Sequence, residues 1–309
     1  MLSLRRTRIK PGWIAVAAQD GIARAVHVVC DDVAARPALR WACSEPWTPA
    51  APAAALRALR RARPLRQHRT VLVLPPASYQ ILTLDAPDLP RDEWRDAIRW
   101  SLKDMLDFEV EHAGIDVLEI PSNPQQRRQA ALFAVATAQA TLLPLADAGA
   151  EAGVPWSAVD IPETALRNLA LLGAEAGRGE ALLHVGAQHS LLVIVAQGEL
   201  LMTRHIEVTL AQLTDADEVQ RQQHFERASL ELQRTLDNVE RQFSFANLAR
   251  LAVAPAAPLL GFINYVRELI YVPVVDFDLG ALIDLTAVPE LTDPVEQAAY
   301  LPAIGAALR

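Results

Sequence analysis

The chain contains a glycine turn of the kind that holds phosphate groups, within ALLHVGAQHSLLVIVAQGELLMTRHIEV at residues 181–208. The pattern predicts a strand, a turn at Gly186, a second strand, a turn at Gly198 and a third strand. A strand that ends in a glycine turn can cradle a phosphate because glycine lets backbone N–H groups approach closely. Such a site normally has a carboxylate nearby for the Mg²⁺ that accompanies the phosphates. Here His184 stands two positions before Gly186, and the next acidic residue is Glu199.

His184 therefore decides how this turn is interpreted. A neutral imidazole does not suit Mg²⁺, which takes oxygen ligands. We expect His184 to be a hydrogen-bonded core histidine, because its strand should be buried; the alternative is a cation that touches a phosphate directly. His189, in the turn, should be more exposed. Phosphoryl transfer depends on positioning of the phosphate and on the charge of the metal ion. Because the carboxylate is missing, we expect this turn to have a structural role and no part in ATP hydrolysis.

No other set of residues in the sequence indicates catalysis or metal binding. Cys30 and Cys43 form no C-x-x-C pair, and no histidine cluster has metal-ligand spacing, which fits a reduced, cytoplasmic setting. No Ser/His/Asp or Cys/His constellation stands out. Six acidic residues between positions 85 and 104 are explained by a helix start and a solvated face. We assign no catalytic residue and no metal ligand, and we expect no cofactor.

The composition argues against a general nucleic-acid-binding role. The 309 residues are 51% hydrophobic, enough for two domain cores, and the net charge is −8. Two basic segments, RRTRIK at residues 5–10 and RALRRARPLRQHR at residues 57–69, are either solvated or in contact with an acidic partner or a membrane surface. The longest uncharged run, residues 129–146, is too short and too polar for a membrane-spanning helix, and residues 1–10 lack the apolar core of a signal peptide.

Two predicted β-hairpins divide the chain into halves. Within residues 12–29, two β-rich runs flank Gln19-Asp20-Gly21, and Asp-Gly is a strong hairpin turn signal. A second hairpin begins at Ala181. Strands and helices alternate through both halves, so the fold class is α/β. Residues 214–254 contain neither Gly nor Pro and carry one apolar seam. They predict a helix of about 30 residues laid across its own domain, with a coiled-coil dimer as the alternative.

A further helix is predicted over residues 89–108, LPRDEWRDAIRWSLKDMLDF. It has Pro90 at its start and acidic residues in its first turn. Its apolar face is formed by Trp94, Ile98, Ser101, Leu102 and Met105. Trp100 points away from that face, among charged residues. It makes either a second packing contact within the protein or part of a binding surface.

Three strings resemble the PilM-type pilus assembly proteins, especially the biogenesis proteins of mannose-sensitive haemagglutinin (MSHA) pili. The strings are LPRDEWRDAIRWSLKDMLDFEVEHAGIDVLEIP, similar to their inserted domain, ELQRTLDNVERQF, similar to a long helix, and AYLPAIGAALR, similar to their C-terminal helix. The resemblance implies an actin-like (ribonuclease H-like), two-lobed α/β fold with a small inserted α+β subdomain in the first lobe. We expect the first lobe at residues 1–69 and 156–179, the inserted subdomain at 70–155, the second lobe at 180–282 and a return helix at 283–309.

The resemblance also implies a partner. PilM-type proteins lie under the inner membrane and bind the short cytoplasmic tail of a bitopic, PilN-like protein in a groove next to the inserted domain. The corresponding expectation is a cytoplasmic protein, peripheral to the inner membrane through its partners. The candidate partner-binding residues are Trp94, Trp100, Leu106 and Phe108.

Members of the family bind ATP, but this sequence departs from their pattern at three places. Gln19-Asp20-Gly21 stands where a D-x-G-S/T turn is expected, His184-Val185-Gly186 replaces D-x-G, and APAAP at residues 254–258 replaces a Gly-Gly adenosine loop. Proline lacks the N–H that a nucleotide would use, and side chains at former glycine positions block close backbone approach. The residues of this degenerate cleft are Gln19, Asp20, Gly21, His184, Gly186, Gln188 and Pro255.

We therefore expect a non-catalytic scaffold of MSHA-like type IV pilus assembly. One alternative is an actin-like ATP-binding protein or ATPase with an atypical site, including weak nucleotide binding without turnover. Another is the cytoplasmic domain of a type II secretion L-like protein. Those domains are usually followed by a membrane span, which this sequence does not show.

Overall fold

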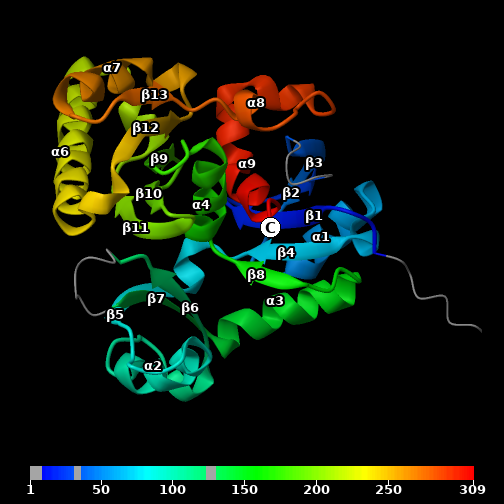
Figure 1. The fold of residues 1–309 in the computed structure, drawn as a ribbon. Helices are drawn as coiled ribbons and strands as arrows, with labels where there is room; N and C mark the ends of the chain where they lie inside the picture. The colour runs from blue at the N-terminus through cyan, green and yellow to red at the C-terminus, as the bar shows by residue number, and fades with distance from the viewer. Residues whose placement is uncertain (1–8, 31–35, 123–129) are drawn as a thin grey trace, which may run out of the picture.

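The first sheet is built around the N-terminal hairpin (Figure 1). The computed structural model describes residues 9–30, 36–122 and 130–309. Asp20 and Gly21 have φ values of 55° and 73°. Two positive φ values in a two-residue loop give a turn whose twist matches that of the flanking strands. In sheet order the strands are β3 (Ala38–Pro46), β2 (Ile22–Val29), β1 (Trp13–Gln19), β4 (Arg69–Val73) and β8 (Ala158–Asp160).

The second sheet repeats the order and directions of the first. Two antiparallel pairings are followed by two parallel ones in each sheet. The tight turn expected at Gly198 is present, with φ of 54° at Gln197 and 83° at Gly198. In sheet order the strands are β11 (Glu199–Ile206), β10 (Ser190–Ala196), β9 (Gly179–Val185), β12 (Leu248–Ala254) and β13 (Val274–Asp276). This repetition is what the two predicted hairpins indicated.

Two helices, α4 (Pro162–Gly173) and α9 (Pro294–Ala306), stand between the two sheets (Figure 1). Leu166 and Leu169 of α4 and Leu301 and Ile304 of α9 share one apolar core with residues of both sheets. The two helices approach closely at Gly305, where an added Cβ would fall inside the backbone of Ala165. The main core therefore joins the two halves of the chain instead of lying within one of them.

The outer face of each sheet carries its own helices. Helices α1 (Pro52–Ala62) and α3 (Gln139–Ala152) cover the first sheet, and α6 (Glu218–Gln242) and α7 (Leu260–Leu269) cover the second. The seam of α6 is buried against its own sheet, as predicted, although the helix has 25 residues instead of about 30. The short helices are α5 (Leu210–Leu213) and α8 (Leu279–Leu282). Among the described residues, no helix combines the length and apolar composition that a bilayer crossing requires.

A third, smaller sheet lies beside the first and carries α2 (Trp94–Leu102) on one face (Figure 1). Trp94, Ile98 and Leu102 are buried against alternate residues of the central strand. The other face of that strand, which includes Val135 and Thr137, points away from α2. In sheet order the strands are β5 (Gln80–Asp85), β7 (Ala131–Ala138) and β6 (Ala113–Ile120).

The structure corrects the sequence analysis in this region. Residues 70–73 were assigned to the inserted subdomain, but as β4 they pair with β1 and β8 in the first sheet. Helix α2 ends at Leu102, so Met105 lies beyond it and is exposed; Ser101 lies within α2 but is exposed as well, instead of facing the core. Strand β3 was not predicted. Helix α3 was assigned to the same subdomain, but its Ala148 and Ala152 are buried against α1 and the first sheet. The other expected domain boundaries stay predictions.

Candidate functional site

The structure brings the expected nucleotide-cleft residues together where the turns of the two hairpins meet. Gln19 Nε2 lies 3.9 Å from the point where a Cβ on Gly186 would stand, so the two hairpin turns face each other closely. Ala254 is opposite His184 in the β9–β12 pairing, which places Pro255 beside the same turn. Asp20, Gly21 and Gln188 are exposed in the turns themselves.

His184 is buried, as expected, and its Nε2 donates to the carbonyl of Ala298 at 2.9 Å. Burial lowers its pKa to about 4, since the charged form would be desolvated. The imidazole is thus neutral at pH 7 and committed to a backbone partner. It provides neither a metal ligand for Mg²⁺ nor a positive charge for a phosphate.

These groups do not fit a magnesium-bound triphosphate. The Gly186 N–H donates to His189 O at 3.1 Å, so it is used within the turn. Pro255 has no N–H, and Gln19 occupies the space beside Gly186. In the described part of the chain, no cluster of three His, Cys, Asp or Glu residues could hold a metal ion.

Glu163, at the start of α4, links the first part of the chain to β11 of the second sheet. It is fully buried and accepts hydrogen bonds from Tyr79 at 2.5 Å and from His205 Nε2 at 3.1 Å. His205 lies against His189, with ring centres 5.2 Å apart. Burial lowers the pKa of His189, and His205 adds to this effect. This polar contact belongs to the architecture between the lobes, because each named group already has a protein partner.

A hollow lies beside α4, and we call it the edge groove. Its cavity volume is about 630 Å³. It opens between the third sheet and the edge of the first, and its floor includes the start of α4 and the C-terminal residues. The edge groove is lined by Leu74, Gly114, Ile115, Asp116, Leu118, Val135, Thr137, Leu142, Val159, Asp160, Ile161, Thr164, Arg167, Asn168, Leu308 and Arg309.

Two sheet edges border the edge groove. Strand β8 ends the first sheet and β6 ends the third; in the described part of the chain each pairs with a strand on one side only. An edge strand presents unpaired backbone N–H and C=O groups. Val159, in the middle of β8, is 40% exposed within the groove. The arrangement can accept an extended peptide through main-chain hydrogen bonds and apolar side-chain contact.

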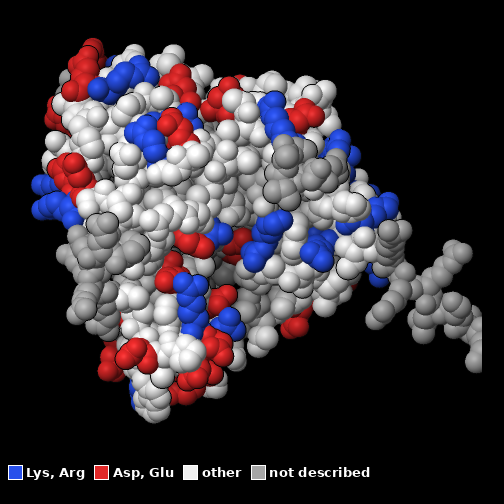
Figure 2. Space-filling view, viewed as in Figure 1, with Lys and Arg blue, Asp and Glu red and all other residues white. Residues whose placement is uncertain are grey.

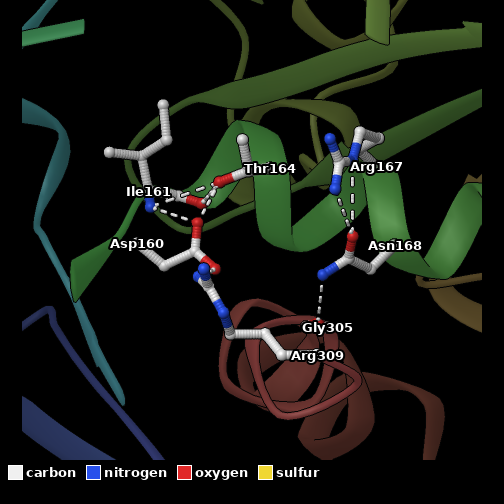
Figure 3. Close-up of polar contacts among 7 residues, drawn as sticks. All are labelled: Asp160, Ile161, Thr164, Arg167, Asn168, Gly305 and Arg309. Carbon is white, nitrogen blue, oxygen red and sulfur yellow. Dashed lines mark hydrogen bonds and ion pairs between the residues drawn. The ribbon is translucent and has the colours of Figure 1, made fainter. Parts of the chain in front are cut away.

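Asp160 organises the floor of the edge groove (Figure 3). Its Oδ1 accepts from the Ile161 backbone N–H at 2.9 Å and from the Thr164 hydroxyl, which fixes the start of α4. Its Oδ2 accepts from Arg309 NH1 at 2.8 Å. The guanidinium of Arg309 also stands over the ring of Trp13, 5.9 Å from its centre. Its side chain remains 39% exposed, so it keeps donors that face the groove.

A second guanidinium group, that of Arg167, lies one turn further along α4 (Figure 3). It donates to Asn168 Oδ1 and to Glu199 of the second lobe at 3.2 Å. Asn168 in turn donates to the carbonyl of Gly305 at 2.9 Å. Arg167 and Leu118 also line an adjoining hollow of about 370 Å³, so the groove continues past α4.

The candidate partner-binding residues do not line the edge groove. Trp94 is buried and donates to Leu89 O at 2.9 Å, while Leu106 and Phe108 are half-buried in the core under α2. Trp100 is on the opposite side of the third sheet and is 81% exposed. The alternative of a second packing contact within the protein is therefore wrong for Trp100. Only the region around Ile115 coincides with the groove.

Sequence reasoning missed the polar residues of the groove. A signal for one group was present: D-I-P-E-T at residues 160–164 places an acidic residue just before a proline-led helix, a typical helix start. No signal pointed to Arg309, which reaches Asp160 from 149 positions away.

Comparison with solved structures agrees with this architecture. A chain of the PilM-PilN type IV pilus biogenesis complex matches with a TM-score of 0.73 at 18% identity, covering 98% of both chains. The chain has the two-lobed actin-like fold that its sequence implied. No family model and no curated protein matches its sequence.

Two other solved structures are more distant. The cytoplasmic domain of EpsL, an inner-membrane component of the Vibrio cholerae type II secretion system, has a TM-score of 0.44 at 12% identity over 67% of this chain and 76% of that one. A Bacteroides thetaiotaomicron protein of unknown function with an actin-like ATPase fold has a TM-score of 0.49 at 8% identity, over 94% and 99% of the two chains.

Proposed function

We propose that this chain is a non-catalytic scaffold of type IV pilus assembly and that its edge groove binds the cytoplasmic tail of a PilN-like, bitopic inner-membrane protein. The observation that carries the proposal is that two sheet edges, β6 and β8, border one groove. The chain shares its fold with a chain of a type IV pilus biogenesis complex that consists of PilM and PilN. Through this partner the protein is held beneath the inner membrane.

The chemistry of the groove suits a short extended tail. Edge strands supply main-chain hydrogen bonds, which are independent of the tail's sequence, and side chains in the groove supply preference. Val159 and Leu142 offer apolar contact, while Arg167 and Arg309 offer donors to carbonyl or carboxylate groups. A tail with apolar residues at alternate positions and an acidic residue near Arg309 fits this surface best.

The non-catalytic part of the proposal rests on the cleft. His184 is neutral and bonded to Ala298, Pro255 offers no N–H, and the amide of Gln19 lies beside the Gly186 turn. Without metal charge and phosphate positioning, phosphoryl transfer loses the terms that supply most of its rate. MSHA is the pilus type that we propose, and the sequence strings at residues 89–121 and 299–309 are its support.

Calorimetry with a synthetic peptide tests the proposal. The peptide is the cytoplasmic tail of the bitopic protein encoded beside this chain, and we expect micromolar or tighter binding. Val159→Glu, which places a charge at the edge strand, should weaken binding at least about tenfold. Val219→Glu is the matched control, because Val219 is exposed on α6, far from the groove. Failure of the peptide to bind, or equal loss in both variants, contradicts the proposal.

A further inference from the structure

The N-terminal part of the chain carries a charge opposite to that of the rest. Residues 1–75 contain 13 Lys and Arg against four Asp and Glu, whereas residues 76–309 contain 16 against 33. In Figure 2 the Lys and Arg atoms on the right lie over the first sheet with few acidic atoms among them. The charge of this acidic protein is therefore distributed asymmetrically. A basic region on an otherwise acidic protein attracts anionic partners to that side.

Three of the described cations of this region, Lys10, Arg63 and Arg69, lie at one end of the first sheet. Lys10 donates its backbone N–H to Gln67 O at 2.8 Å, which places it beside His68. Arg69 is opposite Trp13 in the β1–β4 pairing and lies over its ring, 5.5 Å from the centre. Arg63 lies over the ring of Trp41 at 5.6 Å. We call these residues, Lys10, Trp13, Trp41, Arg63, His68 and Arg69, the basic face.

The members of the basic face lie close to one another. The ring of His27, which is buried beneath this face, lies 4.1 Å from that of His68 and 5.8 Å from that of Trp41, so the Lys10 side and the Arg63 side pack on one residue. Lys10, Arg63 and Arg69 are exposed, and Trp13 and Trp41 are half-buried. Among the residues that the structure describes, none of these three cations has an ion-pair partner. Arg5, Arg6 and Arg8 of the first basic segment lie outside the described residues.

We propose that the basic face lies directly on a membrane surface that contains anionic lipid. Arginine and lysine are attracted to headgroup phosphates, and tryptophan is enriched at the level of the headgroups because its ring is apolar and its N–H is polar. A nucleic-acid surface would share the cations. Lipid is favoured because the chain as a whole is acidic and two cations of the basic face lie over the rings of Trp13 and Trp41.

The position of the basic face also agrees with the proposed function, although the proposed membrane contact does not depend on that function. Arg309 stands over Trp13 of the basic face and pairs with Asp160 in the edge groove, so the two surfaces are neighbours. A tail that leaves the membrane next to the basic face therefore enters the groove without a long linker. The hairpin turn at Asp20 and Gly21 is at the other end of β1, about 20 Å from Trp13 at the rise per residue of a strand.

Vesicle co-sedimentation of the full chain tests the proposal. The probes are vesicles of phosphatidylcholine, alone or with about 30% phosphatidylglycerol, at about 0.05 and 0.5 M salt. We expect binding only to the anionic vesicles at low salt, with loss at high salt because the attraction is screened. The triple variant Lys10→Gln/Arg63→Gln/Arg69→Gln should bind at least about tenfold more weakly.

The matched control is Lys103→Gln/Arg234→Gln/Arg241→Gln, which removes the same charge from exposed positions on α6 and beyond α2. It should bind within about twofold of the unmodified chain. Circular dichroism and Tm verify that both triple variants are folded. Absence of binding to anionic vesicles, or equal loss in both variants, overturns the proposal. So does binding of a single-stranded oligonucleotide in place of vesicles.

The tail-peptide measurement separates this proposal from the proposed function. The basic-face variant should bind the peptide normally, because none of its three substituted residues lines the edge groove. A protein that binds vesicles but not the tail would leave the membrane contact intact and remove the proposed function. A protein that binds the tail but not the vesicles would keep the proposed function and remove the membrane contact.

Discussion

Arg309 pairs with Asp160 at 2.8 Å and so attaches the last residue of the sequence to the edge strand β8. Arg309→Ala should cost the fold about 1 kcal/mol or less, because the arginine is partly solvated and Asp160 keeps its contacts with Ile161 and Thr164. The same change should weaken tail binding about tenfold by removing a charged donor from the groove. Urea unfolding and calorimetry measure the two effects, with Arg234→Ala as the control. Unchanged affinity would place the tail elsewhere.

The contact between α4 and α9 depends on the absence of a side chain at Gly305. A Cβ there would overlap the backbone of Ala165, which cannot move without separating the helices. Gly305→Ala should therefore destabilise the protein by about 3 kcal/mol or more. Gly261→Ala on α7 is the same change in open packing, since its Cβ would lie 3.7 Å from the ring of Phe225. It should be neutral or stabilising by up to about 1 kcal/mol.

Urea unfolding of the two variants tests this prediction through the denaturant concentration at the midpoint of each transition. If Gly305→Ala and Gly261→Ala unfold at the same denaturant concentration, the two helices are not held as closely as described.

The buried His184 should make the protein less stable in mild acid. Its pKa is lowered from 6.5 to about 4 by burial, although its hydrogen bond to Ala298 opposes the shift. Below pH 6.5 the unfolded chain therefore takes up a proton that the folded chain does not. The free energy of unfolding falls as pH decreases through this window, by about 3 kcal/mol from this group by pH 4.

Urea unfolding between pH 7 and pH 5 measures this dependence. His184→Gln keeps a hydrogen-bond donor and should reduce the slope by up to about 1.4 kcal/mol per pH unit. His112→Gln is the control, since His112 is 72% exposed. The same slope in all three proteins would show that His184 is not buried neutral.

Magnesium and ATP together should produce no binding heat and no phosphate release. The reason is that the Gly186 turn lacks a carboxylate and faces Gln19 instead of an open cleft. Calorimetry and a phosphate assay check this. A clear isotherm that disappears in Gly186→Trp would establish nucleotide binding in the cleft and contradict the prediction.

Trp100 provides a test of where the partner binds. Because its side chain is 81% exposed, Trp100→Ala should change stability by less than about 0.5 kcal/mol. It should also leave tail affinity unchanged, since Trp100 lies on the opposite side of the third sheet from the edge groove. Loss of affinity in Trp100→Ala, with Val159→Glu unaffected, would move the binding site to α2.

Local chemistry by itself determined several elements of the fold. Asp20 and Gly21 favour a two-residue hairpin turn on their own, because both tolerate positive φ. The seam of α6 from Phe225 to Val239 repeats at helical spacing, so one face had to be buried. The histidine in a uniformly apolar strand was expected to be buried and bonded, and His184 is.

Only the tertiary structure decided the edge groove and the basic face. Thr70–Val73 has the pattern of a strand, but that pattern does not state which sheet it joins; pairing with β1 settles this. In the same way Arg309, Asp160 and Trp13 are distant in sequence and each is an ordinary residue alone. They become a site because packing of α9 between the two sheets brings them together, and long-range packing leaves no local signal in the chain.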